Sequence, residues 1–114
     1  SPMSFFDSEI VRSEMTEISE LQDEVYGKFM HFPYMSNEDK LVQVSNLEKL
    51  IEKQKILYAR LSLSDDPEAK MMLERITDSA QMMGISKDVD MNVVFDNMSE
   101  MLKIMKQQID NGNS

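Results

Sequence analysis

The sequence is poor in the residues that usually carry catalysis or metal binding. Its 114 residues include one histidine, three glycines, no cysteine and no tryptophan. Without cysteine, disulfides and thiolate metal sites are excluded. A carboxylate-bridged di-iron bundle needs Glu-x-x-His on two helices, and the single imidazole of His31 cannot supply that within one chain. These absences disfavour most enzyme classes, and we expect no cofactor and no bound transition metal.

Phosphate-binding and membrane-spanning patterns are missing as well. The sequence contains neither a glycine-rich phosphate-binding loop nor the HExxH metal motif. No apolar run approaches the ~20 residues that cross a bilayer, and no basic stretch followed by an apolar run opens the chain. We therefore expect a cytoplasmic protein that does not associate with membranes.

The charge balance is strongly acidic, with 21 acidic and 12 basic side chains and a net charge of -9. Such a balance disfavours nucleic acid and anionic lipid as direct partners. Residues 1–26 contain seven of the acids and a single base. The acidic segment is interpretable as a solvated face, as a complement to the bases of residues 49–60, or as a binding face for a basic partner.

The dominant signal is apolar residues at helical spacing. Four segments show it, at about residues 4–30, 37–61, 67–83 and 91–109. The second segment has a heptad rhythm, which favours pairing with the first. We predict an all-α, four-helix arrangement: a long antiparallel hairpin of the first two helices, with two shorter helices packed across it.

Local signals mark the ends of these segments. Pro33 disfavours helix at the preceding residue, and Ser36 opens a capping pattern for the second helix. For the third helix, Asp65 is the cap with Glu68 as its partner, or Asp66 is the cap with Pro67 at the first helical position. Gly84 is a helix stop, and Asp88 or Asp90 begins the fourth helix.

Domain organisation follows from these segments. We interpret residues 1–2, which precede Met3, as a cloning remnant. Residues 3–110 are predicted to form a single all-α domain, because 114 residues correspond to one ordinary domain. Residues 111–114, of sequence NGNS, are predicted to be a frayed tail.

Methionine is unusually abundant, with 12 residues. Methionine fills irregular gaps in cores and also forms adaptable binding surfaces. The second and fourth helices carry apolar stripes too wide for one small bundle to cover, which predicts a homodimer or a surface reserved for another protein. The candidate interaction surface comprises Leu57, Tyr58, Met91, Phe95, Met98, Met101 and Met105.

Two further groups invite a chemical interpretation. The acids within residues 64–66 are candidates for a carboxylate metal cluster, but their position before Pro67 favours helix capping. His31 with Tyr26 and Tyr34 is a candidate polar pocket, although a loop histidine packed on aromatic rings is the simpler interpretation.

Three stretches of the chain carry a resemblance to a known family. They are FFDSEIV at residues 5–11, LEKLIEKQKILYARLSLSDDPEA at 47–69, and DMNVVFDNM at 90–98 followed by Leu102 and residues 106–108. The chain resembles an uncharacterised family, a domain of unknown function found in cyanobacteria and in the contractile-tailed phages that infect them. The resemblance spans residues 3–109, and the run at 61–66 is its most specific part. It implies an all-helical cytoplasmic protein and assigns no activity to any residue.

Three functional hypotheses remain open. The first is a non-enzymatic interaction or regulatory protein that binds itself or a host protein, which for a phage product means redirecting a host machine. The second is a small enzyme or ligand-binding protein whose site forms at a dimer interface. The third is an acidic nucleic-acid mimic.

Overall fold

The structure is a computed structural model that describes residues 4–112, and these residues form helices and no strand. Two short 3₁₀ helices and four α-helices follow one another: η1 (Phe5–Asp7), α1 (Glu9–Lys28), η2 (Phe29–Tyr34), α2 (Asn37–Leu63), α3 (Pro67–Met82) and α4 (Met91–Asp110). The all-α prediction is confirmed. The predicted cloning remnant at 1–2 and the end of the predicted tail at 113–114 lie outside the described residues.

Side-chain caps set the starts of the last two helices. Asp66 accepts a hydrogen bond from the backbone N–H of Glu68 at 2.9 Å, with Pro67 at the first helical position. Asp90 accepts one from the N–H of Asn92, also at 2.9 Å. Each cap satisfies a backbone donor that has no partner inside its helix. Of the alternatives left open by the sequence, Asp66 and Asp90 are therefore the caps.

Gly84 ends α3 as predicted. Its φ of 93° lies in the left-handed region, which costs little only for glycine. The N–H of Ile85 donates to the carbonyl of Ala80, and the N–H of Gly84 donates to that of Gln81, both at 2.9 Å. This pair of bonds is the Schellman motif, which satisfies the last carbonyls of the helix.

The predicted continuous helix over residues 4–30 is wrong at both ends. At the start, Ser4 and Asp7 form a closed capping box around η1, and Ser8 is extended, so α1 begins only at Glu9. At the other end the chain passes directly into η2, where an irregular connection was predicted around Pro33. Proline is tolerated in this short 3₁₀ segment because no long helical ladder has to continue through it.

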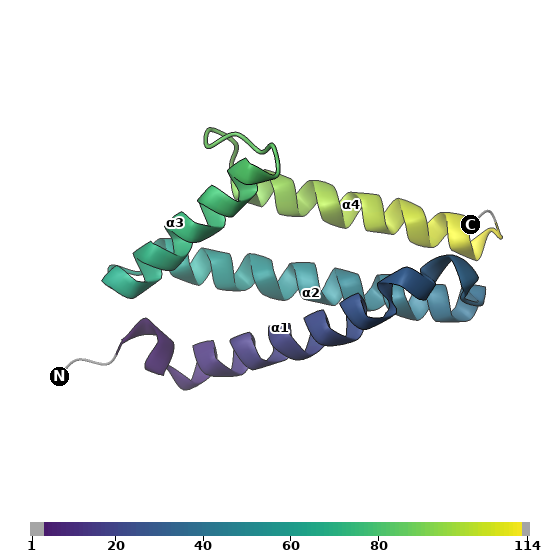
Figure 1. Cartoon of the computed structure of the whole chain (residues 1–114), viewed down its shortest axis with the longest axis horizontal. Coiled ribbons are helices and arrows are strands. Elements are labelled where there is room, and N and C mark those ends of the chain that lie inside the picture. Colours follow the sequence, from purple (N-terminus) through teal and green to yellow (C-terminus); the bar gives the residue numbers. More distant parts are fainter. Residues whose placement is uncertain (1–3, 113–114) are drawn as a thin grey trace.

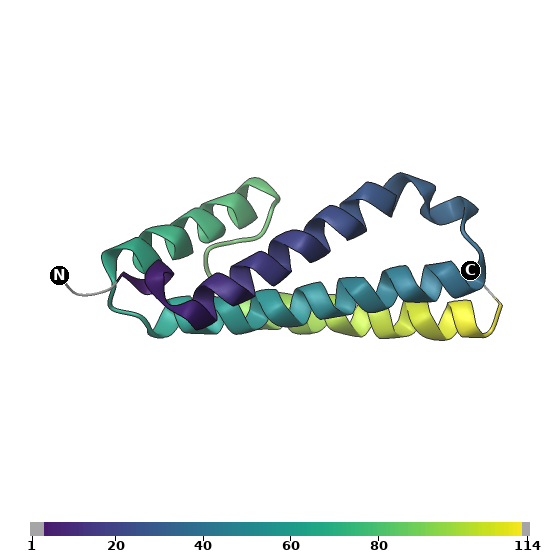
Figure 2. The ribbon, with the colours of Figure 1, turned by 90° about the horizontal axis from the view of Figure 1, so that it is seen from below.

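Helix α2 is the central element of the fold. Helices α1 and α4 both run antiparallel to α2 along its length, and α3 packs near the C-terminal end of α2 (Figures 1 and 2). The predicted hairpin of the first two helices is present. Helix α4 was predicted to be shorter than the first two helices and to pack across their hairpin. It has 20 residues, as many as α1, and it lies along α2.

Two apolar clusters lie on different sides of α2. The first joins η1, α1, α2 and α3, and its buried members are Val11, Ile18, Leu50, Leu57, Leu61 and Ala69. The second joins α2 to α4 and η2, and its buried members are Val44, Ile51, Phe95, Leu102 and Ile109. The wide heptad stripe predicted for α2 is therefore divided between two neighbours. None of the helices within residues 4–112 has the length and apolarity to cross a membrane.

Candidate interaction groove

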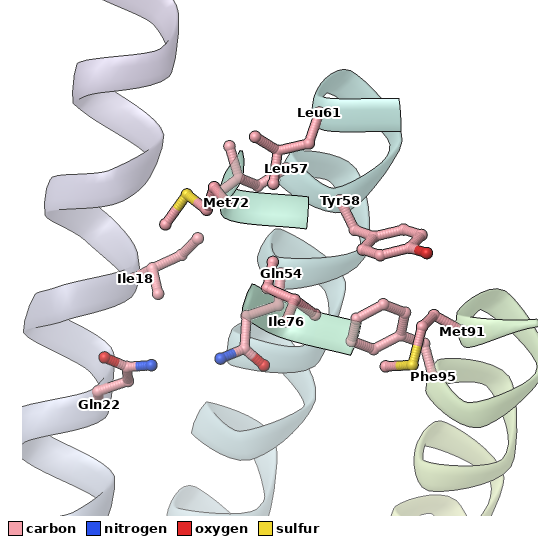
Figure 3. A pocket seen from close by; sticks show the side chains of 10 residues that line it. All are labelled: Ile18, Gln22, Gln54, Leu57, Tyr58, Leu61, Met72, Ile76, Met91 and Phe95. Carbon is pink, nitrogen blue, oxygen red and sulfur yellow. The ribbon is translucent and has the colours of Figure 1, made fainter. Parts of the chain in front are cut away.

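An open hollow lies over α2, between α1, α3 and α4 (Figure 3). Its volume is about 320 Å³. The lining residues are Ile18, Gln22, Gln54, Leu57, Tyr58, Leu61, Met72, Ile76, Met91 and Phe95. The lining contains no charged side chain, so the hollow suits an apolar occupant.

Two glutamines are the only amides in this lining. Gln22 projects from α1 and Gln54 from α2, and their amide groups point toward one another across the gap (Figure 3). Within residues 4–112 neither amide has a hydrogen-bond partner. An amide carries two N–H donors and a carbonyl acceptor. An occupant that brings a polar group among apolar ones would find a hydrogen-bond partner in either amide.

The hollow continues between α3 and α4. A second hollow of about 360 Å³ shares Met72, Ile76, Met91 and Phe95 with the first. Its further lining is Arg75, Ser79, Ala80, Met83, Ile85, Val94 and Met98. We call the two together the methionine groove, because four methionines line it. Long, unbranched and polarizable side chains of this kind adapt to differently shaped occupants.

Helix α4 presents two different stripes to its surroundings. Its charged residues, Asp96, Glu100, Lys103, Lys106 and Asp110, share one side. Two of them are held against α2, Asp96 by Lys55 at 2.6 Å and Lys106 by Glu48 at 3.0 Å. The uncharged face of α4 comprises Met91, Val94, Asn97, Met98, Met101, Ile104, Met105 and Gln108. It extends the methionine groove outward onto the surface of the helix.

The predicted interaction surface is only partly at the surface. Leu57 and Phe95, each 8% exposed, are core residues of the first and second clusters, and only their edges reach the groove. Tyr58 and Met91 are half-buried in its lining. Met98, Met101 and Met105 are exposed on the uncharged face of α4. The predicted set therefore combines residues buried beneath the groove with residues exposed on α4. The helical spacing of apolar residues does not by itself distinguish the buried members from the exposed ones.

Several groove residues were not predicted. They are Gln22 and Gln54, Met72 and Ile76 of α3, Met83 just after α3, and Val94 of α4. Ile104, on the uncharged face of α4, was not predicted either. A signal for the α4 residues is present in the sequence, because all five charges of that helix fall on one side. No comparable signal marks Gln22 and Gln54, which become neighbours only when α1 packs on α2.

The acids of α1 are partly matched by the bases of α2. Glu14 contacts Arg60 at 2.8 Å, and Glu17 contacts Lys53. This agrees with the interpretation of acidic α1 as a complement to basic α2. On the opposite side of α2, the hydrogen bond and the charge of Asp96 raise the pKa of Lys55 above its ordinary value, and desolvation opposes that shift.

The structure supports neither of the two other candidate sites, the acids of residues 64–66 and the group of His31, Tyr26 and Tyr34. Ser64 accepts a hydrogen bond from the N–H of Asp66 at 3.1 Å, and Asp66 is the cap of α3, so this run is a helix start. Residues 4–112 hold no group of three or more potential ligands arranged around a metal position. His31, Tyr26 and Tyr34 are all exposed, which contradicts both the polar-pocket and the packed-loop interpretations.

Comparisons with known proteins place the chain in a family. Neither the curated proteins nor the solved structures contain a match to it. One family model, described as a domain of unknown function (DUF1825), matches residues 3–109. Its limits coincide with the resemblance seen in the sequence and span all four α-helices. The chain therefore belongs to the DUF1825 family of domains of unknown function.

Proposed function

We propose that the chain is a non-enzymatic interaction protein that binds an amphipathic helix in the methionine groove. The observation that supports this is the continuity of the groove with the uncharged face of α4. The groove lies between three helices, so a helix placed in it is surrounded as it would be in a bundle. The occupant is a helix of a second copy or of another protein.

The exposed apolar surface gives this binding its driving force. On α4 alone, Val93, Met98, Met101, Ile104 and Met105 are exposed. Apolar area removed from water contributes roughly 25 cal/mol per Å². Contiguous apolar patches of more than a few hundred Å² are unusual on proteins that act alone, and they commonly mark interaction sites. The methionines allow the same surface to accept more than one sequence.

The biological setting is a proposal that rests on the sequence resemblance. We place the protein in the cytoplasm of a cyanobacterium, as a product of the cell or of an infecting phage. In this setting, a small helical protein that is not an enzyme acts by binding to the surface of a larger protein complex. For a phage product, that machine belongs to the host, with transcription and photosynthesis as the natural targets.

The test is a capture experiment with matched variants. The tagged chain is immobilised and exposed to cyanobacterial lysate supplemented with an untagged copy of itself. Met101→Glu places a charge on the uncharged face of α4, whereas Met82→Glu places the same charge at an exposed position on α3. We expect a protein that is retained by the wild type and by Met82→Glu and lost with Met101→Glu. Equal retention by both variants would refute the uncharged face of α4 as part of the binding surface.

A second function, binding of a small neutral ligand, is favoured by one observation. Gln22 and Gln54 direct two amides without partners into an apolar hollow of about 320 Å³. Such a combination suits a ligand with an apolar body and one hydrogen-bonding group. Nile red, a neutral apolar dye, is the probe. Binding that is retained in Met101→Glu and weakened in Gln54→Leu would support this function over helix binding.

The acidic-mimic hypothesis receives no support from the described residues. A mimic needs its carboxylates free and in regular rows. In α1, Glu14 and Glu17 are paired with bases of α2, and Glu24 contacts Lys28 within the helix. These pairings neutralise part of the row that would have imitated phosphates.

A further inference from the structure

We infer that the occupant of the methionine groove is α4 of a second copy of this chain. Two copies then pack their uncharged α4 faces against each other, antiparallel and about a two-fold axis. The inference rests on the proposed function, since it names the partner of the same groove.

A single copy leaves more surface exposed than a compact monomer of its mass. Its accessible surface is 8028 Å². A compact monomer of 13.2 kDa has about 6,400 Å². The excess of about 1,600 Å² is more than the ~800 Å² that each partner contributes to a standard stable interface. One copy thus carries enough uncovered surface for a dimer.

The shape of the chain leads to the same result. Its radius of gyration is 16.2 Å, against about 13 Å for a compact domain of this length. Its extents are 55 × 31 × 20 Å. Helices α1, α2 and α4 run side by side, and α3 covers only one end of α2 (Figures 1 and 2). A further helix over the uncovered stretch completes a bundle there.

The distribution of charge also favours a second copy on the uncharged face of α4. Each copy carries a net charge of -9, so the repulsion between two copies is smallest where the contact itself is free of acid. The uncharged face of α4 meets this condition from Met91 to Gln108. The charged stripe of α4 lies on its other side, where Asp96 and Lys106 are held by α2. The dimer therefore buries the methionines without burying an unpaired carboxylate.

The neighbouring wall of the groove is also uncharged. On α1, the residues that share the helical face of the lining residue Gln22 are Met15, Ser19 and Tyr26. A basic partner would gain nothing from this surface, because the acids of α1 lie elsewhere around the helix. A second copy brings the uncharged face of its own α4 to this surface, so its fit is self-complementary, as a two-fold contact requires. Arg75 is the charged member of the groove lining.

The length of α4 fixes the register of the pair. The helix runs from Met91 to Asp110, so its centre lies beside Met101. In an antiparallel two-fold pair, the central residues of the two helices lie near the axis and opposite one another. Met98 of each copy then lies opposite Met105 of the other. The polar Asn97 lies about one helical turn from the centre, and Gln108 falls near the end of the contact.

The first test measures mass in solution. Light scattering coupled to size exclusion at micromolar concentration should give twice the chain mass of 13.2 kDa for the wild type. Met101→Glu, which introduces two like charges near the axis, should raise the dimer dissociation constant on the order of 100-fold. Met82→Glu, at a position 90% exposed on α3, should remain a dimer. Circular dichroism checks that both variants keep the helical fold.

The second test measures the register. The chain has no cysteine, so a single introduced cysteine is unique. Met101→Cys treated with a short bis-maleimide should cross-link into a dimer, whereas Met82→Cys should remain monomeric on a denaturing gel. Equal cross-linking of the two variants would overturn the antiparallel α4 contact, even if the protein is a dimer.

The outcomes separate this inference from the proposed function. A wild-type mass of one chain across the micromolar range overturns the second copy as occupant. If Met101→Glu still abolishes capture of a different protein, the proposed function stands without the homodimer. If neither a dimer nor a Met101-sensitive partner is found, both proposals are wrong. A dimer that is equally stable in Met101→Glu overturns the α4 face and leaves the partner unassigned.

Discussion

The N–H of Phe5 donates a hydrogen bond of 2.5 Å to Oδ2 of Asp66, which lies 61 residues further along the chain. The other carboxylate oxygen of Asp66 caps α3. One side chain thus anchors η1, at the beginning of the described chain, to the start of the third α-helix. Ser4 adds a hydrogen bond from its Oγ to Glu68 at 2.6 Å. The junction explains why η1 separates from α1 and lies against α3.

Replacing Asp66 should therefore cost more than the loss of an ordinary cap. Asp66→Ala should reduce the free energy of unfolding by about 2 kcal/mol, since it removes an N-cap and a charge-assisted hydrogen bond together. Asp65→Ala is the matched control, and it should change stability by less than about 0.5 kcal/mol. Urea denaturation followed by circular dichroism measures both. Similar losses in the two variants would contradict the assignment of Asp66 as the cap.

Two leucines near the end of α2 test the division of that helix into a buried and an exposed side. Leu61 is 1% exposed in the first cluster, whereas Leu63 is 86% exposed. Leu61→Ala should lower the free energy of unfolding by about 3 kcal/mol, because it removes buried apolar area and leaves a cavity. Leu63→Ala should change it by less than about 0.5 kcal/mol. The two substitutions are chemically identical, so a comparable effect on the urea midpoint would refute the burial pattern.

Two glycines should respond oppositely to alanine. Gly84 has a φ of 93°, so Gly84→Ala should destabilise the protein by about 1 kcal/mol even though nothing lies within 4 Å of the new methyl group. Gly27 is inside α1 and has equally open surroundings. Gly27→Ala should stabilise the protein by about 0.5 kcal/mol through helix propensity. Thermal unfolding of both variants checks the signs, and a stabilising Gly84→Ala would exclude the Schellman motif.

The Lys55–Asp96 pair predicts a pH dependence in the alkaline range. The pKa of Lys55 is raised above 10.5, first by its hydrogen bond to Asp96 and then by the charge of that residue. Because the folded pKa exceeds the unfolded one, the contribution of the pair is complete below the unfolded pKa and is lost as pH rises through the folded pKa. An NMR titration of the lysine side chain should give a lower pKa for Lys55 in Asp96→Asn. An unchanged value would show that this ion pair does not persist in solution.

The sequence by itself determined the helices and most of their ends. Serine, aspartate, proline and glycine act on backbone groups within a few residues, so Ser36 and Gly84 could be assigned from local chemistry, and the cap of α3 could be narrowed to Asp65 or Asp66. The spacing of apolar residues likewise gave an all-α chain. The division at Ser8 was missed because η1 is held by Asp66, a residue far away in the sequence.

Only the tertiary structure decided which neighbour covers each apolar stripe. A helical period shows that residues share a face, but it does not show what packs against that face. In α4, Phe95 and Leu102 pack against α2, while Met98 and Met101 from the same predicted stripe remain exposed. The groove exists because α1 and α4 lie on different sides of α2 and α3 reaches only one end of it. That arrangement depends on long-range packing between helices, which local propensities do not encode.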